Sequence, residues 1–268
     1  MPLWEDMVTT DFAALDPARA VALLPVAAIE QHGPHLPLGT DAILCDAILD
    51  RTQNIVADPA SLLRLPTQRV GLSPEHAGFP GTLVLRAESL LTAWTEIGLS
   101  VAAAGVRKLV LFNTHGGQGG LVDIVAQQLR CRAGMLVVRC SSYRFALPEG
   151  WVPPDELRFG LHGGLIETSM MLAAAPSLVR RGFMHSFHSP AADWEAAHPG
   201  LEVEGESGIA WCAQDLGIDG VTGDASAATA ELGQRLLDHY ASRLAKTIAA
   251  ARSLVFPPQS QPDAPSSR

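Results

Sequence analysis

The sequence predicts an α/β protein with three layers, in which helices cover both faces of a mostly parallel central sheet. Short apolar runs of strand length alternate along the chain with longer segments of helical periodicity. Polar residues begin abruptly where the apolar runs end, and 47% of the 268 residues are hydrophobic, enough for a sizeable core. In such a sheet, ligands bind in the loops at the carboxyl ends of the strands.

Residues 21–29 (VALLPVAAI) are the first apolar run, and we expect them to form a strand that is covered on both faces. Pro25 has no N–H to donate to a neighbouring strand, which predicts an edge position or a local bulge. Residues 41–53 repeat apolar side chains at helical spacing, with Thr40 or Asp41 available as the N-terminal cap. The loop between them, rich in glycine and proline, therefore joins the first strand to the first helix.

The same order of loop, helix and strand continues through the middle of the chain. A loop over residues 70–81 leads to a helix over 88–104 and a strand over 108–113. After a glycine-rich turn come a helix over 121–130 and a strand over 135–139. This alternation favours a parallel sheet.

The last third of the chain has two helical segments separated by an irregular one. We expect helices over residues 163–175 and 225–251, the second rich in alanine and packed on the outside, and an irregular polar stretch over 183–208. Residues 257–268 have the composition of a disordered tail. Because no internal repeat or linker interrupts the rest, residues 1–256 are expected to form a single domain.

Charge and hydropathy argue against two classes of partner. The formal net charge is -9 and no run of lysine or arginine forms a basic stripe, so nucleic-acid binding is not expected. The longest apolar stretches, such as residues 20–29, are too short to span a membrane, and the N-terminus has no basic leader segment. We therefore expect a cytoplasmic protein without a membrane partner.

The loop after the first strand carries side chains of the kinds that bind metals. In the motif EQHGPHLPLGTD, Glu30 and Asp41 supply carboxylates, and His32 and His35 supply imidazoles. Oxygen and nitrogen ligands together suit zinc, manganese or iron. The alternative is that the carboxylates cap a helix or pair with arginines while the histidines lie on the surface.

Three further residues favour the metal site. His115 follows an apolar strand and is flanked by glycines, although Thr-His-Gly-Gly alone is also typical of a tight turn. His162 and Glu167 lie at the start of a predicted helix, where a carboxylate can instead stabilise the helix dipole. Charged groups that converge at strand ends and helix starts must be paired or metal-bound, so we interpret them together as a metal site.

These motifs resemble those of the creatininase (creatinine amidohydrolase) family of metal-dependent amidohydrolases. The resemblance rests on EQHGPHLPLGTD, NTHGG and HGGLIETSMML, with support from HAGFPGT and GVTGD, and it extends from about residue 24 to about residue 230. It implies a creatininase-like α/β fold and a homo-oligomer, with a hexamer as one form.

The resemblance also implies a dinuclear site. Two divalent cations, zinc first, with manganese and iron as alternatives, would be bound by Glu30, His32, Asp41, His115 and Glu167. Asp41 would bridge the two cations. Glu30 and His115 would complete one side of the site. His32 and Glu167 would complete the other side.

The reaction that the resemblance implies is hydrolysis of a non-protein C–N bond in a small amide, cyclic amide or formamide, by a hydroxide that bridges the two cations. His162 would shuttle the proton that the leaving nitrogen needs, and Glu167 could share that work. His35 would support the ligands from behind. The alternatives are a peptidase acting on a small modified peptide and a metal-binding family member without catalysis.

The chain departs from the creatinine-hydrolysing members of the family at two places. Those members carry an acid two residues after the histidine that matches His115, where this chain has Gly117, so Glu167 is expected to supply the remaining ligand. They also carry tryptophans around the substrate, where this chain has Arg144 and Arg158, which argues against creatinine. Arginines that face the pocket would favour an anionic substrate, and the alternative is that both lie exposed on loops.

Overall fold

The computed structural model describes residues 1–255, and the predicted tail over residues 257–268 lies outside them. Within the described residues, the central sheet has the strands β1 (Val21–Val26), β2 (Leu62–Arg64), β3 (Lys108–Asn113) and β4 (Leu136–Ser141), in the order β2-β1-β3-β4. All neighbouring strands are parallel. Val26 of β1 pairs with Asn113 of β3, so the carboxyl ends of the two central strands lie side by side.

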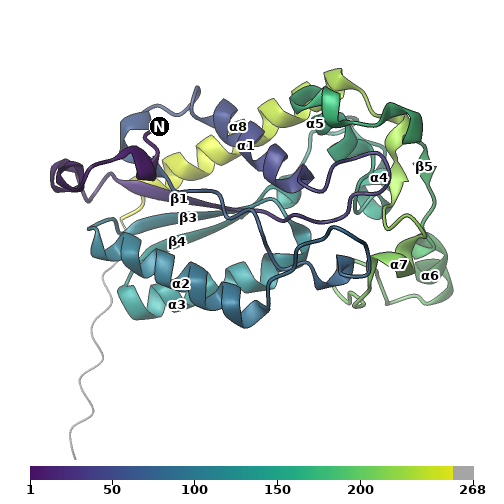
Figure 1. The fold of residues 1–268 in the computed structure, drawn as a ribbon, viewed down its shortest axis with the longest axis horizontal. Coiled ribbons are helices and arrows are strands. Elements are labelled where there is room, and N and C mark those ends of the chain that lie inside the picture. Colours follow the sequence, from purple (N-terminus) through teal and green to yellow (C-terminus); the bar gives the residue numbers. More distant parts are fainter. Residues whose placement is uncertain (256–268) are drawn as a thin grey trace, which may run out of the picture.

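Helices cover both faces of this sheet (Figure 1). One face carries α1 (Thr40–Thr52), α5 (Leu165–Ala174) and α8 (Ala230–Ser253), and the other carries α2 (Ala87–Ala103) and α3 (Gly119–Ala133). Side chains of β1 alternate between the two cores, with Val21 and Leu23 in the first and Ala22 and Leu24 in the second. The three-layer α/β/α prediction is therefore confirmed. Among residues 1–255, no helix is both long and apolar enough to cross a membrane.

Pro25 lies in an internal strand whose pairing with β3 continues past it, so the predicted edge position and bulge are both wrong. The carbonyls of Leu23 and Pro25 accept hydrogen bonds from the N–H groups of Leu65 and Gln68, which places their hydrogen-bonding groups on the β2 side. The β1–β2 ladder ends at the pair of Leu23 and Arg64. The missing N–H of Pro25 therefore falls beside the end of β2 and removes no bond from the β1–β3 ladder.

The first helix begins one residue before its predicted start. Gly39 occupies the N-cap position, so neither Thr40 nor Asp41 caps the helix as expected. The Thr40 hydroxyl instead donates a hydrogen bond to the carbonyl of Pro37, at 2.7 Å. The Asp41 carboxylate turns toward histidines at the carboxyl end of the sheet, which gives this residue its place in the site.

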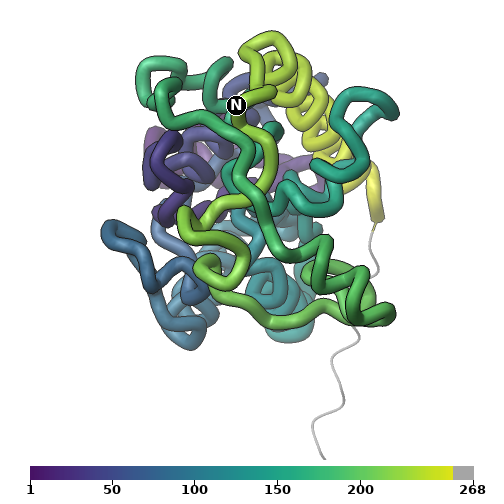
Figure 2. The backbone as a smooth tube through the Cα atoms, turned by 90° about the vertical axis from the view of Figure 1, so that its right-hand side faces the viewer, coloured from purple at the N-terminus to yellow at the C-terminus, as the bar shows by residue number. Residues whose placement is uncertain are grey.

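The sequence patterns do not predict the short elements that precede α8. These are α4 (Pro154–Phe159), β5 (Ser186–Phe187), α6 (Ala191–Ala197), α7 (Ala213–Leu216) and β6 (Gly223–Asp224), with β5 antiparallel to β6. Both β5 and α6 lie within the stretch over 183–208 that was expected to be irregular. In Figure 2 this part of the chain, in green, runs in front of the rest of the molecule and across the carboxyl end of the sheet.

Candidate metal centre

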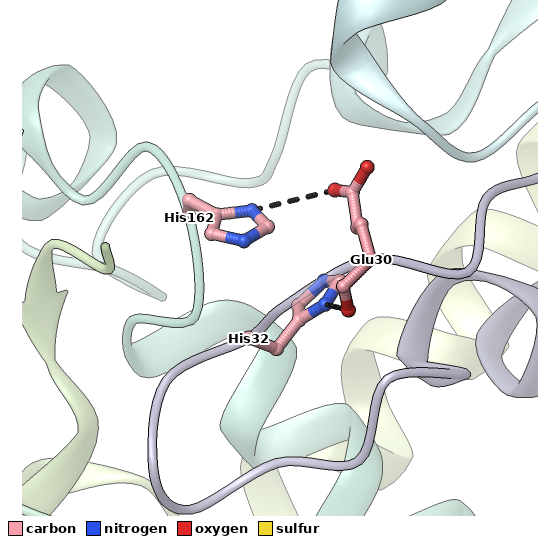
Figure 3. A group of neighbouring side chains, drawn as sticks. All are labelled: Glu30, His32 and His162. Atoms are coloured by element: carbon pink, nitrogen blue, oxygen red, sulfur yellow. Dashed lines mark hydrogen bonds and ion pairs between the residues drawn. The ribbon is translucent and has the colours of Figure 1, made fainter. Parts of the chain in front are cut away.

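Three loops bring the predicted site residues together at the carboxyl end of the sheet. The loop after β1 carries Glu30 and His32 and leads to Asp41 in the first turn of α1. The loop after β3 carries His115. The loop before α5 carries His162 and leads to Glu167 in the first turn of that helix. All are buried except Glu167, whose side chain is 24% exposed. The side chains of Glu30, His32 and His162 are shown in Figure 3.

Two glycines let the first loop and the loop before α5 approach each other. Gly33 and Gly163 both have a φ of 69°, a backbone conformation that favours glycine. A Cβ on either residue would also lie within 2.8 Å of the Val221 side chain. This close packing on Val221 holds His32 and His162 together, with ring centroids 4.2 Å apart.

Asp41 lies between two groups of possible ligands. Its Oδ1 is 3.4 Å from His32 Nε2, and its Oδ2 is 3.5 Å from His115 Nδ1. The ligand atoms of Glu30, Asp41 and His115 all lie within 4.8 Å of one another, and we call this group the His115 side. The same holds for His32, Asp41 and Glu167, which we call the His32 side. Asp41 is the residue that the two groups share.

On the His115 side, the imidazole is fixed from behind. His115 Nδ1 is 3.1 Å from Glu30 Oε2, and its Nε2 is 2.9 Å from the carbonyl oxygen of Leu72. A carbonyl only accepts, so Nε2 carries the proton and Nδ1 is left for a ligand role. The Ser73 hydroxyl donates a hydrogen bond of 2.5 Å to Glu30 Oε2 and orients that carboxylate.

On the His32 side, the ligands are fixed by the backbone. His32 Nδ1 donates to the Glu30 carbonyl at 3.1 Å, so its Nε2 faces Asp41 and also Glu167, whose Oε2 is 3.9 Å away. The same Glu167 oxygen accepts a hydrogen bond from the backbone N–H of Gly163, at 2.6 Å. Glu167 therefore sits beside His32, at the more open edge of the site.

Charges within the cluster shift its titration strongly. Burial would raise the pKa of Glu30, but the positive charge of His115 outweighs it and lowers that pKa below its usual range. Burial would lower the pKa of His115, but the negative charge of Glu30 outweighs burial and raises that pKa well above its usual value. Burial and repulsion from Glu30 raise the pKa of Asp41 to about 6. Although burial opposes it, the neighbouring Asp41 carboxylate raises the pKa of His32 to about 9.

His162 presents a free ring nitrogen to the site. Its Nε2 donates a hydrogen bond to the carbonyl of Gln31 at 2.7 Å, so the other nitrogen, Nδ1, faces Glu30 Oε1 at 3.8 Å (Figure 3). Burial, followed by the charge of His32, lowers the pKa of His162. A neutral imidazole with its lone pair toward the cluster can accept a proton there.

His35 lies behind the loop that precedes α5. Its Nε2 is 2.9 Å from both the Gly163 carbonyl and the Thr168 hydroxyl, and its ring stacks on Phe187. Burial lowers the pKa of His35 to about 4, so the ring is neutral at neutral pH. His35 therefore supports the backbone of Gly163, whose N–H holds the Glu167 carboxylate.

The donors of the cluster fit divalent cations. His32 Nε2 and Asp41 Oδ2 are buried and have no hydrogen-bond partner among the described residues. Leaving buried polar atoms unpaired is unfavourable, and both atoms point into a cluster of imidazole and carboxylate donors. Such a mixture of nitrogen and oxygen donors is the one that zinc and manganese accept.

The second loop adds residues that the sequence patterns did not assign to the site. His76 Nε2 is 3.4 Å from Glu30 Oε1, and Glu75 Oε1 is 3.4 Å from His115 Nε2. Gln31 Nε2 lies 2.8 Å from His76 Nδ1. Ser-Pro-Glu-His pairs an acid with an imidazole, as the first loop does, and that repeated pairing was the available signal.

Arg158 does not line the site. Its half-exposed side chain pairs with Glu195 and Glu202 on the surface, which is the second of the two alternatives for this arginine. Arg144 is exposed as well, with its guanidinium 5.9 Å from the centroid of the Tyr143 ring. These contacts give no support to an arginine clamp for an anionic substrate.

Comparison with known proteins gives a consistent result. The family model Creatininase, described as creatinine amidohydrolase, matches residues 5–248. The chain is 31% identical over 219 residues to a mycofactocin precursor peptide peptidase from Mycolicibacterium smegmatis, covering 81% of this chain and 79% of that protein. It is 34% identical over 180 residues to a creatinine amidohydrolase from Pseudomonas putida, covering 59% of this chain and 66% of that protein. A solved structure described as "Creatininase Mn" has a TM-score of 0.71 at 25% identity, covering 94% of this chain and 99% of that chain.

Proposed function

The chain belongs to the creatininase family, and from this premise we propose that it hydrolyses a C–N bond in a small amide, cyclic amide or formamide with two bound divalent cations. The observation that carries the proposal is the place of Asp41, whose two carboxylate oxygens face His32 on one side and His115 on the other. A carboxylate shared between two three-residue groups can contribute to two neighbouring cation sites. Zinc is the expected metal, with manganese and iron as alternatives.

The residues around the cations would handle the protons. When bound, two such cations acidify a water molecule and polarise the amide carbonyl that it attacks. His162 Nδ1 takes up a proton at the cluster and passes it to the leaving nitrogen, while Nε2 stays bound to the Gln31 carbonyl. Glu167, at the open edge, is a second proton acceptor within the same site.

A second candidate function is cleavage of a small modified peptide. It is favoured by the 31% identity, over most of this chain, to a relative named as a peptide peptidase. A peptide bond is an amide, so the two functions require the same nucleophile and the same proton transfer. They differ only in how much substrate the site must accept.

The test is to measure cation content and turnover on the same preparation. Plasma mass spectrometry of the purified protein should give close to two transition-metal ions per chain, and fewer in Glu30→Gln. A panel of cyclic amides, formamides and short peptides, assayed for released amine, then separates the two candidate substrates. A chain that binds no cation after incubation with zinc or manganese would contradict the proposal.

A further inference from the structure

The buried side chain of Gln31 lies between two backbone groups that fix the orientation of its amide. The backbone N–H of Gly33 donates a hydrogen bond to Gln31 Oε1 at 2.9 Å, and Gln31 Nε2 donates to the carbonyl oxygen of Gly220 at 2.6 Å. The reversed amide would place two donors together at Gly33 and two acceptors together at Gly220. The second hydrogen of Gln31 Nε2 is therefore left for one further acceptor.

That acceptor is His76, whose Nδ1 lies 2.8 Å from Gln31 Nε2. An amide NH₂ group only donates, so His76 Nδ1 accepts through its lone pair and the ring proton is on Nε2. His76 Nε2 lies 3.4 Å from Glu30 Oε1 and 3.9 Å from Glu75 Oε1. His76 therefore directs an N–H group toward the carboxylates, and its protonated Nε2 is not free to bind a metal.

The main chain of Gln31 fixes His162 in the opposite way. The Gln31 carbonyl accepts a hydrogen bond from His162 Nε2 at 2.7 Å, so the lone pair of His162 is on Nδ1, which lies 3.8 Å from Glu30 Oε1. The rings of His76 and His162 are neighbours, with centroids 4.3 Å apart and an angle of 31° between their planes. Two adjacent imidazoles thus face one carboxylate oxygen, one with an N–H group and the other with a lone pair.

We propose that Gln31 is a positioning residue, whose amide keeps His76 a hydrogen-bond donor toward Glu30 and whose carbonyl keeps His162 a proton acceptor. The catalytic part of this inference rests on the two-cation function proposed above. With its proton on Nε2, His76 orients the Glu30 carboxylate and does not compete with His162 for a proton. With its proton on Nδ1, His76 would direct a lone pair at Glu30 and would be a second acceptor beside His162.

Neutron diffraction from crystals of the perdeuterated wild-type protein, grown with Zn²⁺, locates the ring deuterons directly. We expect a deuteron on Nε2 of both His76 and His162 and none on either Nδ1. A deuteron on His76 Nδ1 would overturn the proposal. Because the measurement requires no turnover, crystals that bind no zinc but show both expected tautomers would contradict the proposed function and would support the assignment of Gln31.

A double-mutant cycle tests whether Gln31 acts through the tautomer of His76. Gln31→Met keeps the length of the side chain but has no N–H group, and it should weaken Zn²⁺ binding to the metal-stripped protein about 10–100-fold, as the loss of a group behind a ligand does. His76→Gln places an amide N–H near the position of Nε2, and an amide has no tautomer to fix. Gln31→Met should therefore cost much less in the His76→Gln background. An equal loss in both backgrounds, measured by calorimetric titration, would overturn the proposal.

The matched control is Gln127→Met, which alters an exposed glutamine of α3 and should leave Zn²⁺ binding unchanged. Turnover of the amide that the substrate panel identifies gives a second measure. Gln31→Met should lower kcat and leave KM unchanged, because it alters the orientation of Glu30 and the proton transfer rather than substrate binding. A raised KM at unchanged kcat would place Gln31 in substrate binding and would overturn the positioning role. Wild-type protein that binds no Zn²⁺ would instead contradict the proposed function.

Discussion

The two sides of Asp41 are built differently. On the His115 side, Glu30 and His115 follow the two central strands of the sheet, and both are almost completely buried. On the His32 side, Glu167 comes from a helix outside the sheet and its side chain is partly exposed. From this difference in burial we propose that the closed half holds its cation more firmly and that the more open half meets the substrate.

The most damaging change removes the residue that the two sides share. Asp41→Asn keeps the shape of the side chain but takes away the charge between His32 and His115, so both cations should be lost and turnover should fall by more than about 10³-fold. Plasma mass spectrometry and the amine-release assay measure the two effects. Asp193→Asn, on an exposed turn of α6, is the matched control. An Asp41→Asn protein with two cations would show that Asp41 does not bridge.

Loss of His162 should separate chemistry from cation binding. His162→Ala removes the Nδ1 that faces Glu30, and turnover should drop by about 10²–10⁴-fold while both cations stay bound. The ligand atoms of His162 also group with those of Glu30 and His32, so the histidine has the geometry of a ligand as well. A fall in cation content along with turnover would therefore assign it to metal binding.

The sequence predicted the strands of the sheet better than it predicted which loop residues meet at the site. Regular apolar runs are a local signal, and β1, β3 and β4 lie close to where the sequence placed them. The short strand β2 was missed because three residues carry no periodicity. Glu75 and His76 were missed for another reason, since their approach to Glu30 depends on how the second loop folds back across the sheet.

The predicted ligands illustrate the same limit. Glu30 and Asp41 could be singled out because they follow a strand and begin a helix. That Asp41 turns into the site rather than capping its helix follows from Gly39 taking the cap position, which is a matter of loop geometry. Glu167 was assigned to the His32 side only through the family resemblance, and it is the fold that brings its carboxylate to 3.9 Å from His32 Nε2.

His35, which lies behind the His32 side, should make the folding stability of the metal-free protein sensitive to acid. His35 is neutral when folded, with a pKa of about 4, whereas its pKa in the unfolded chain is about 6.5. The unfolded state therefore binds more protons between these values, so stability falls as pH is lowered from 6.5 to 4, with about 3 kcal/mol of that loss due to His35. Urea unfolding across this range should show a smaller loss in His35→Asn. Equal slopes in the two proteins would contradict the assignment.

The smallest effect tests the difference in openness directly. Because the His32 side reaches solvent through Glu167 whereas the His115 side is closed, a chelator should remove the two cations in separate phases, and the His32 side should empty first. Glu167→Gln should speed the fast phase about 10-fold and leave the slow phase unchanged, since it weakens only one side. Stopped-flow absorbance with a coloured chelator resolves the phases, and Glu231→Gln, in the first turn of α8, is the matched control. If Glu167→Gln accelerates both phases equally, the two sides release their cations as one unit. The division of the site at Asp41 would then describe the geometry of the site but not the release of its cations.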